Sequence, residues 1–276
     1  MGDLAREYDR QLERLRRREE QLFRRDAARR KGRILSWAEK RVPDKLILTM
    51  DTAFYTAFQV LFQRGTRLLG RTIPARKLLG ERYLKEYAIR KAPGARSMGA
   101  FQRSAALSGT LTTAAATVEG CVLGLLGMGL PDIPILMSIL LRSIYHTAVR
   151  YGFAYDTKGE RSYILLVLCA ALTDGPDRQS YSARADELGR LLDQDQVPWV
   201  DLEVQMREAA KALAGAMLVP KFLQGMTFIG VVGGASNFST SRRVTEMANL
   251  KYQRRFWEKN RRRLTAPDRF PPEERR

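Results

Sequence analysis

The sequence predicts an all-α protein, a multi-helix single domain around a Gly-rich apolar helical hairpin, with a basic N-terminal helical arm. Apolar residues recur at steps of three and four along most of the chain, which is the period of an amphipathic helix. No strand-type alternation of any length appears. Hydrophobic residues make up 45% and charged residues 28% of the 276 residues, a composition typical of globular proteins rather than of disordered ones.

The N-terminal segment, residues 1–32, is predicted to be a basic charged helical arm. The residues near heptad spacing on this helix are Leu4, Tyr8, Leu12, Leu15 and Leu22. Such a stripe suits a partner helix or a membrane surface. Because it is narrow and short, we interpret the segment as a solvated arm.

Two helices are predicted between the arm and the central hairpin. Residues 45–64 are strongly apolar and rich in aromatic side chains, which indicates a core helix. Residues 77–91 form a basic amphipathic helix, whose apolar side chains are Leu78, Leu79, Tyr83, Leu84 and Tyr87.

The central stretch, residues 104–156, contains two apolar segments joined at a Pro-Asp-Ile-Pro turn. Glycine in a helix interior costs about 1 kcal/mol relative to alanine, so a seam of glycines indicates close approach of another backbone. A tightly packed helix pair in a soluble core is the favoured interpretation, and a membrane-inserted hairpin is the alternative. The small residues that share one face of the first segment, residues 105–128, are Thr113, Thr117, Gly120, Gly124 and Gly127.

The second segment is predicted to be a helix over residues 135–151, with Asp132 as its cap and Pro134 in its first turn. A buried arginine needs a partner, because an unpaired internal charge is costly. We therefore predict an ion pair of Arg142 with either Glu119 or Asp132. The polar stripe of this helix consists of residues at i, i+4 spacing: Ser138, Arg142, His146 and Arg150.

Further helices are predicted after the hairpin. Residues 162–173 are apolar on nearly all sides, which predicts a buried helix. The tail, residues 264–276, is rich in proline and charge and is predicted to be disordered. The remaining predicted elements are amphipathic helices at 183–193 and 201–217, a glycine-rich apolar segment at 220–234, and a long helix that begins at Asn237 or Ser239.

The positive charge of the chain is unevenly distributed. The net charge is +18, and residues 64–103 alone hold 11 basic and 2 acidic side chains. Residues 151–220 are instead net acidic, with 7 basic and 11 acidic side chains. Basic flanks of this kind suit an anionic surface, either a phospholipid leaflet or a nucleic acid.

Basic and aromatic side chains are combined near the C-terminus, and this combination favours the lipid interface. We therefore predict a membrane-binding or anion-binding segment there. Its candidate residues are Arg254, Arg255, Phe256, Trp257, Lys259, Arg261, Arg262 and Arg263.

A polar cluster inside the apolar hairpin is the candidate for chemistry. A carboxylate, a histidine and an arginine held in an apolar environment have shifted pKa values, which suits acid–base catalysis in a hydrolase-like enzyme. A buried ion-pair network is the favoured structural interpretation, so the sequence does not decide whether the protein is an enzyme. The candidate residues are Glu119, Asp132, Arg142, His146 and Tyr151.

No metal or cofactor is predicted. The chain has one histidine, and its cysteines, Cys121 and Cys169, lie far apart in the sequence. Nucleophile-elbow, Walker and dinucleotide-binding fingerprints are absent from the sequence. No hydrophobic segment near the N-terminus resembles a secretory signal, so a reducing cytosol is expected.

Several motifs together resemble the EcsC family, which is named after a bacterial protein encoded beside an ABC transporter. The resemblance covers roughly residues 33–257 and leaves the arm outside. It depends on WAEKRVPDK (37–45), GMGLPDIPILMSILLRSIYHTAVRYGF (127–153), SYILLVLCAAL (162–172), VPKFLQGMTFIGVVGGASNF (219–238) and the following RRVTEMANLKYQRRF.

The resemblance implies a helical domain over residues 33–263, either cytoplasmic or membrane-associated, of unsettled activity and without assigned catalytic residues. The family's link to transport and secretion implies an adaptor or accessory factor. We expect a cytoplasmic, peripherally membrane-associated protein, whose partner is an anionic membrane surface or a membrane protein such as an ABC transporter. Nucleic acid is the weaker alternative, because no known recognition module appears in the sequence. The oligomeric state is not predicted.

Overall fold

The computed structural model describes residues 2–30, 43–91, 98, 132–196, 199–225 and 233–265. These residues form helices and their connections without any strand, which confirms the all-α prediction. The elements are α1 (Gly2–Arg30), α3 (Asp44–Val60), the π-helical turn η1 (Leu61–Gly65), α4 (Thr66–Arg71), α5 (Ala75–Lys91), α8 (Asp132–Tyr151), α9 (Lys158–Leu172), α10 (Gly175–Leu192), α11 (Leu202–Gly225) and α12 (Gly233–Thr265).

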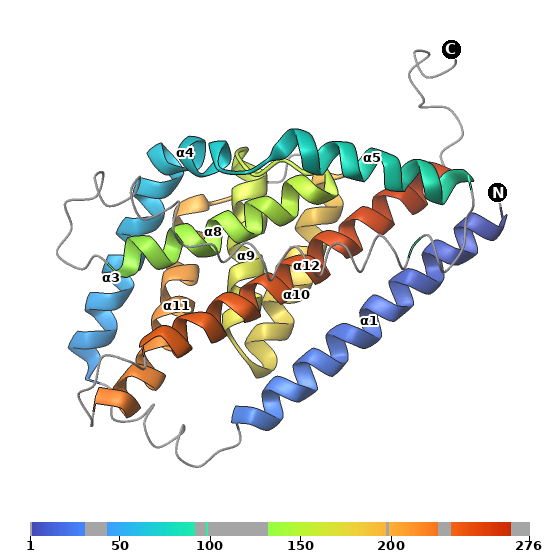
Figure 1. Ribbon diagram of the computed structural model, residues 1–276. Helices are drawn as coiled ribbons and strands as arrows, with labels where there is room; N and C mark the ends of the chain where they lie inside the picture. Colours follow the sequence, from blue (N-terminus) through green and yellow to red (C-terminus); the bar gives the residue numbers. More distant parts are fainter. Residues whose placement is uncertain are drawn as a thin grey trace.

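Helix α9 lies at the centre of the described bundle, in contact with α10, α11 and α12 (Figure 1). Its first turn is capped by Thr157, whose hydroxyl accepts a hydrogen bond from the backbone N–H of Glu160 at 3.2 Å. Every residue from Ser162 to Leu172 is buried, because neighbouring helices cover the helix on all sides. The burial predicted from its all-round apolar sequence is therefore confirmed.

Helix α8 is the second segment of the predicted central hairpin. It extends over residues 132–151, so it begins three residues before the predicted start at residue 135, and the predicted cap, Asp132, is its first residue. It contacts α12 on one side and α3, α4 and α5 on others. The chain leaves the helix at Gly152, where φ is +78° and a Cβ would lie 2.1 Å from the guanidinium of Arg82 on α5. A glycine is required there both by the backbone angle and by the close approach of α5.

Some predicted segments lie outside the described residues. These are the first segment of the hairpin with its small-residue seam (Thr113, Thr117, Gly120, Gly124 and Gly127), residues 226–232 of the glycine-rich segment, and residues 266–276 of the C-terminal tail.

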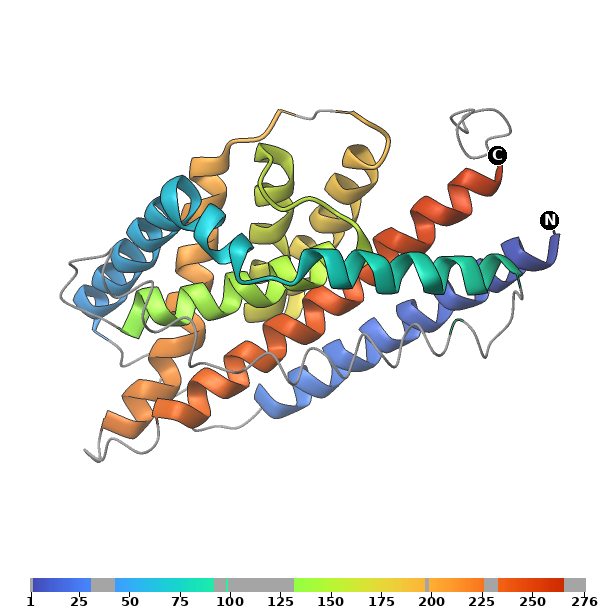
Figure 2. The same cartoon turned by 45° about the horizontal axis from the view of Figure 1, so that its top comes forward.

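Helix α1 packs antiparallel along α12, as Figures 1 and 2 both show. Its apolar stripe is buried at Tyr8, Leu15 and Leu22. The ring of Tyr8 lies 5.5 Å from the ring of Trp257 on α12, centroid to centroid. The interpretation of this segment as a solvated arm is therefore wrong, because the helix that covers the stripe is supplied by the same chain.

Candidate functional site

The polar stripe of α8 is internal. Ser138 is fully buried, and its hydroxyl donates to the backbone carbonyl of Pro134 at 2.7 Å, so it is satisfied within its own helix. His146 and Arg150 are each only 6% exposed. Arg142 is half-buried, and its contacts place this part of the stripe next to the connection between α4 and α5.

Arg142 is anchored on the connection between α4 and α5. Its Nε donates to Oγ1 of Thr72 at 2.9 Å, and its Nη2 donates to the carbonyl oxygen of Thr72 at 3.2 Å. Both predicted ion-pair partners, Glu119 and the side chain of Asp132, lie outside the described residues. The predicted pairing with either of them stays a prediction, whereas Thr72 is a partner that the sequence did not indicate.

His146 lies in an environment that disfavours its protonation. Burial lowers its pKa most, and the charges of Arg150 and Arg142 lower it further, to about 4. The carboxylate of Glu81 on α5 opposes this shift but does not reverse it. The imidazole is therefore neutral at physiological pH.

We expect the single histidine of the chain to titrate near pH 4, which NMR of the imidazole carbons measures without ambiguity. The unfolded chain takes up its proton near pH 6.5, so folding stability is complete above that pH and falls as the pH is lowered towards 4. This contribution amounts to about 3 kcal/mol between pH 7 and pH 4. His146→Gln removes this pH-dependent contribution to the free energy of unfolding. The difference in stability between wild type and variant, measured across this pH range, therefore isolates it. A titration midpoint near 6.5 would contradict the buried position.

Tyr151 lies apart from the rest of the predicted cluster. Its ring is 1% exposed and packs against Phe256 of α12 at 5.8 Å between centroids. Burial raises the pKa of its hydroxyl well above the usual value, so the phenol is neutral. The structure thus groups Arg142 with His146 and Arg150 and directs Tyr151 towards α12.

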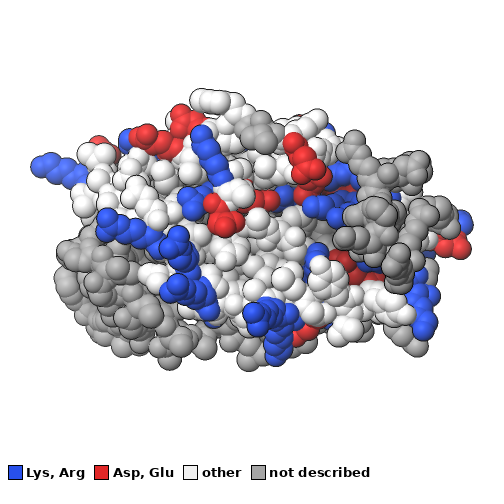
Figure 3. Space-filling model, turned by 90° about the horizontal axis from the view of Figure 1, so that it is seen from above, with Lys and Arg blue, Asp and Glu red and all other residues white. Residues whose placement is uncertain are grey.

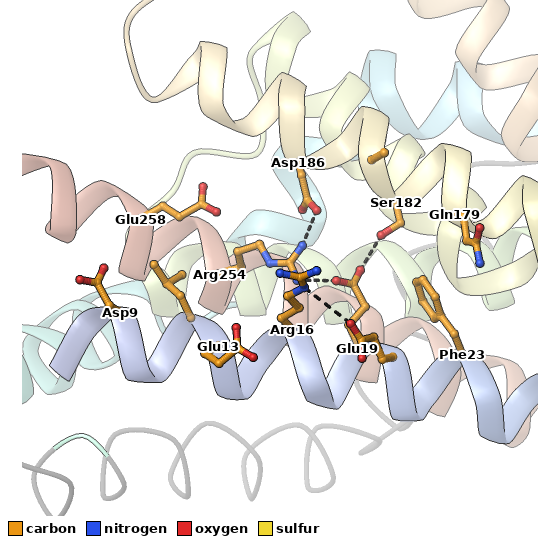
Figure 4. A pocket seen from close by; sticks show the side chains of 13 residues that line it. Asp9, Glu13, Arg16, Glu19, Phe23, Gln179, Ser182, Asp186, Arg254 and Glu258 are labelled. Atoms are coloured by element: carbon orange, nitrogen blue, oxygen red, sulfur yellow. Dashed lines mark hydrogen bonds and ion pairs between the residues drawn. The ribbon is translucent and has the colours of Figure 1, made fainter. Parts of the chain in front are cut away.

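A cavity of about 490 Å³ lies between α1, α10 and α12. Figure 4 shows Arg254 at its base, bound to both Asp186 and Glu19. The buried ammonium group of Lys251 also contacts these two carboxylates, at 2.8 Å each. Burial alone would raise the pKa of Glu19, but Lys251 and Arg254 outweigh it and leave that pKa below its usual value.

These ion pairs give the cavity wall a structural role, because they join α1 to α10 and α12. Its described lining residues include none from α8, so the cavity is separate from the polar stripe. They are Asp9, Leu12, Glu13, Arg16, Glu19, Glu20, Phe23, Gln179, Ser182, Ala183, Asp186, Arg254 and Glu258.

The first half of the predicted C-terminal membrane segment is buried in the core, which corrects that assignment. Phe256 is 3% and Trp257 is 0% exposed. Arg255 donates to both carboxylate oxygens of Glu160, at 2.6 and 2.7 Å, and to Asp193 at 3.0 Å. Arg254 is committed to the ion pairs of the cavity wall. These four side chains are therefore parts of the fold and not a lipid-binding surface.

The second half of that segment is mostly paired as well. Lys259 and Arg262 each lie 3.7 Å from the carboxylate of Asp193, and Arg261 binds Asp9 of α1 at 2.9 Å. Arg263 is exposed. Acidic residues that are distant in sequence thus neutralise most of the basic end of α12, which sequence spacing did not reveal.

Helix α5 presents an apolar surface to solvent, whereas its sequence predicted only a basic amphipathic helix. Tyr83, Leu84 and Tyr87 are 60%, 72% and 64% exposed. The two acidic residues of this helix, Glu81 and Glu86, are half-buried or buried and form ion pairs with Lys85, Arg82 and Arg90. The feature of the sequence that indicates this surface is the excess of basic over acidic residues in 64–103.

Exposed cations surround this apolar surface. Figure 3, which looks onto α4 and α5, shows Lys and Arg side chains that project from largely uncharged surface, with some Asp and Glu side chains among them. Six exposed cations form no ion pair with a residue that the structure describes. They are Arg64 of η1, Arg67 and Arg71 of α4, and Arg76, Lys77 and Lys91 of α5.

Of the helices that the structure describes, none combines the length and the apolar content needed to cross a membrane. Within the same residues, no group of three or more His, Cys, Asp or Glu side chains is placed to hold a metal ion.

Comparison with known proteins identifies the family. The EcsC protein family matches residues 9–256, so the match includes most of α1, which the motif-based resemblance at residues 33–257 had left out. The uncharacterized protein YdbA of Bacillus subtilis (strain 168) is 28% identical over 180 residues, which are 60% of this chain and 60% of that relative. No solved structure matches. Because the family match covers most of the sequence and nearly all of the described helices, this protein belongs to the EcsC protein family.

Proposed function

We propose that this protein attaches peripherally to anionic membrane surfaces from the cytoplasmic side and acts there as an adaptor or accessory factor. The observation that supports this proposal is the basic surface of η1, α4 and α5, on which six exposed cations have no ion-pair partner among the described residues. A cation near an anionic leaflet contributes about 1 kcal/mol, so several together suffice for reversible binding. A membrane-protein partner, such as an ABC transporter, stays a prediction of the family resemblance.

The alternative of a hydrolase-like enzyme has less support. The polar stripe would have to act through His146, which is buried and whose pKa of about 4 makes it a weak base at neutral pH. Nucleic-acid binding would use the same basic surface, but it would leave the exposed apolar side chains of α5 without a role. Nucleic-acid binding is separated from membrane binding by the experiment below.

The test is sedimentation of the purified protein with vesicles. We expect binding to phosphatidylcholine vesicles that contain phosphatidylglycerol, no binding to phosphatidylcholine alone, and release as salt rises from about 0.1 M to 1 M, where the Debye length shortens from about 10 to 3 Å. Parallel gel-shift assays with DNA and RNA serve as the comparison. Absence of binding to the anionic vesicles, or tighter binding to nucleic acid at equal salt, would overturn the proposal.

A further inference from the structure

We propose that α5 lies in the plane of the membrane and that Tyr83, Leu84 and Tyr87 enter the headgroup region of an anionic phospholipid leaflet. This inference rests on the proposed function and names the surface and the side chains that perform it. We call this surface the α5 face. It consists of these three residues together with the exposed cations at the two ends of the helix: Arg76, Lys77, Arg90 and Lys91.

The α5 face is a continuous stripe along the helix. With the exposed Gly80 between Lys77 and Tyr83, its positions recur at steps of three and four, which places them on one side of an α-helix. The stripe from Arg76 to Lys91 is about 22 Å long at 1.5 Å per residue. The apolar side chains occupy its middle and the cations its ends.

In its middle, α5 departs from the pattern of an ordinary surface helix. A helix that only packs on a protein core buries its apolar side and exposes its charges. In α5 the acids Glu81 and Glu86 and their partners Arg82 and Lys85 are less exposed than Tyr83, Leu84 and Tyr87. The guanidinium of Arg82 even approaches the backbone at Gly152. The apolar side chains therefore point away from the described core and towards solvent.

The helix is held in place for this role. Leu78 and Ile89 are 5% and 1% exposed and belong to the core, and α5 lies along α8 in Figures 1 and 2. The outward surface is thus presented by a helix already packed against the core, and binding requires little additional ordering.

Charge complementarity selects an anionic lipid surface as the occupant. Tyrosine is enriched at membrane–water interfaces, where its ring is buried and its hydroxyl is hydrated. The Lys and Arg side chains at both ends of the stripe extend their charged groups to lipid phosphates, while their apolar stems lie along the acyl boundary. A second copy of the same face would instead place like charges against each other.

The decisive experiment compares two charge-matched double variants in the vesicle assay. Leu84→Glu/Tyr87→Glu adds two negative charges to the α5 face. Leu48→Glu/Val204→Glu adds the same two charges at exposed apolar positions on α3 and α11, where the native side chains are 68% and 51% exposed. We expect the α5 variant to bind anionic vesicles at least about tenfold more weakly and the control to bind nearly as wild type. Because all four side chains are exposed, both variants should retain the helical circular dichroism and the thermal midpoint of the wild type.

A second measurement reports insertion directly. An environment-sensitive fluorophore is attached to Leu84→Cys and, as a control, to Leu48→Cys, each in a Cys121→Ser background. The native Cys169 is only 1% exposed and does not compete for the label. We expect a blue shift on anionic vesicles for the label at residue 84 and none at residue 48.

The outcomes separate the inference from the proposed function. If wild type does not bind anionic vesicles, the proposed function fails and the inference fails with it. If wild type binds but the α5 variant binds as well as its control, membrane attachment stands and the α5 face is excluded. If the α5 variant loses binding while the label at residue 84 stays in water, insertion of the apolar side chains is excluded.

Discussion

Replacing Arg255 with methionine is expected to lower the free energy of unfolding by about 3–5 kcal/mol, the largest effect of any charge removal considered for this protein. The guanidinium is 4% exposed and binds Glu160 and Asp193, whose side chains are 9% and 1% exposed. Removing it leaves the carboxylate of Glu160 buried without its bidentate partner. Asp193 retains Lys259 and Arg262 at 3.7 Å, so most of the loss arises at Glu160.

Urea unfolding followed by circular dichroism measures this effect. The matched control is Arg207→Met, because Arg207 and Glu203 form an ion pair whose side chains are 63% and 61% exposed. Solvent screens that pair, so its removal should change the free energy of unfolding far less than the removal of Arg255. We also expect the double variant Glu160→Met/Arg255→Met to recover part of the loss, since it removes the buried charge. Equal stability of Arg255→Met and Arg207→Met would show that the Glu160–Arg255 contact does not form.

Replacing Trp257 with alanine is expected to cost about 3–5 kcal/mol, because the indole is fully buried and its removal leaves a large cavity. Its ring lies 5.5 Å from that of Tyr8 on α1 and 4.8 Å from that of Phe256, in an edge-to-face arrangement with the latter. The cavity therefore opens at the contact between α1 and α12. We expect α1 to become a preferred site of limited proteolysis in this variant.

Trp199→Ala is the matched control, because that indole is 87% exposed and its removal should change stability by no more than about 0.5 kcal/mol. The comparison also separates the structural role of Trp257 from the membrane role that the sequence had indicated. A lipid anchor would lose vesicle binding on substitution while keeping full stability. Substitution of a core residue lowers the stability of the protein, and the folded fraction of the variant still binds vesicles.

The sequence by itself determined the helical architecture and the family, because the periodicity of apolar residues is a local property. The burial of α9, the end of α8 at Tyr151 and the polar stripe on α8 all follow from side chains within a few turns of one another. The family motifs are contiguous as well. Local patterns of this kind are readable before the chain is folded.

Only the tertiary structure decided which basic and apolar side chains face solvent. The cations at the end of α12 pair with Glu19, Asp186, Glu160 and Asp193, which are 62 to 235 positions away in the sequence. No spacing rule connects residues that far apart, so a buried ion-pair network and an exposed lipid-binding segment have the same local sequence pattern.

The same limit explains why the sequence did not show which side of α5 faces solvent. Its composition identifies a basic amphipathic helix but not the side on which the rest of the protein packs. That side is set by α8, whose Arg142 binds Thr72 and whose end at Gly152 receives Arg82. With the charged side of α5 held against the protein, Tyr83, Leu84 and Tyr87 face outward, and the candidate membrane surface arises on this helix rather than at the C-terminus.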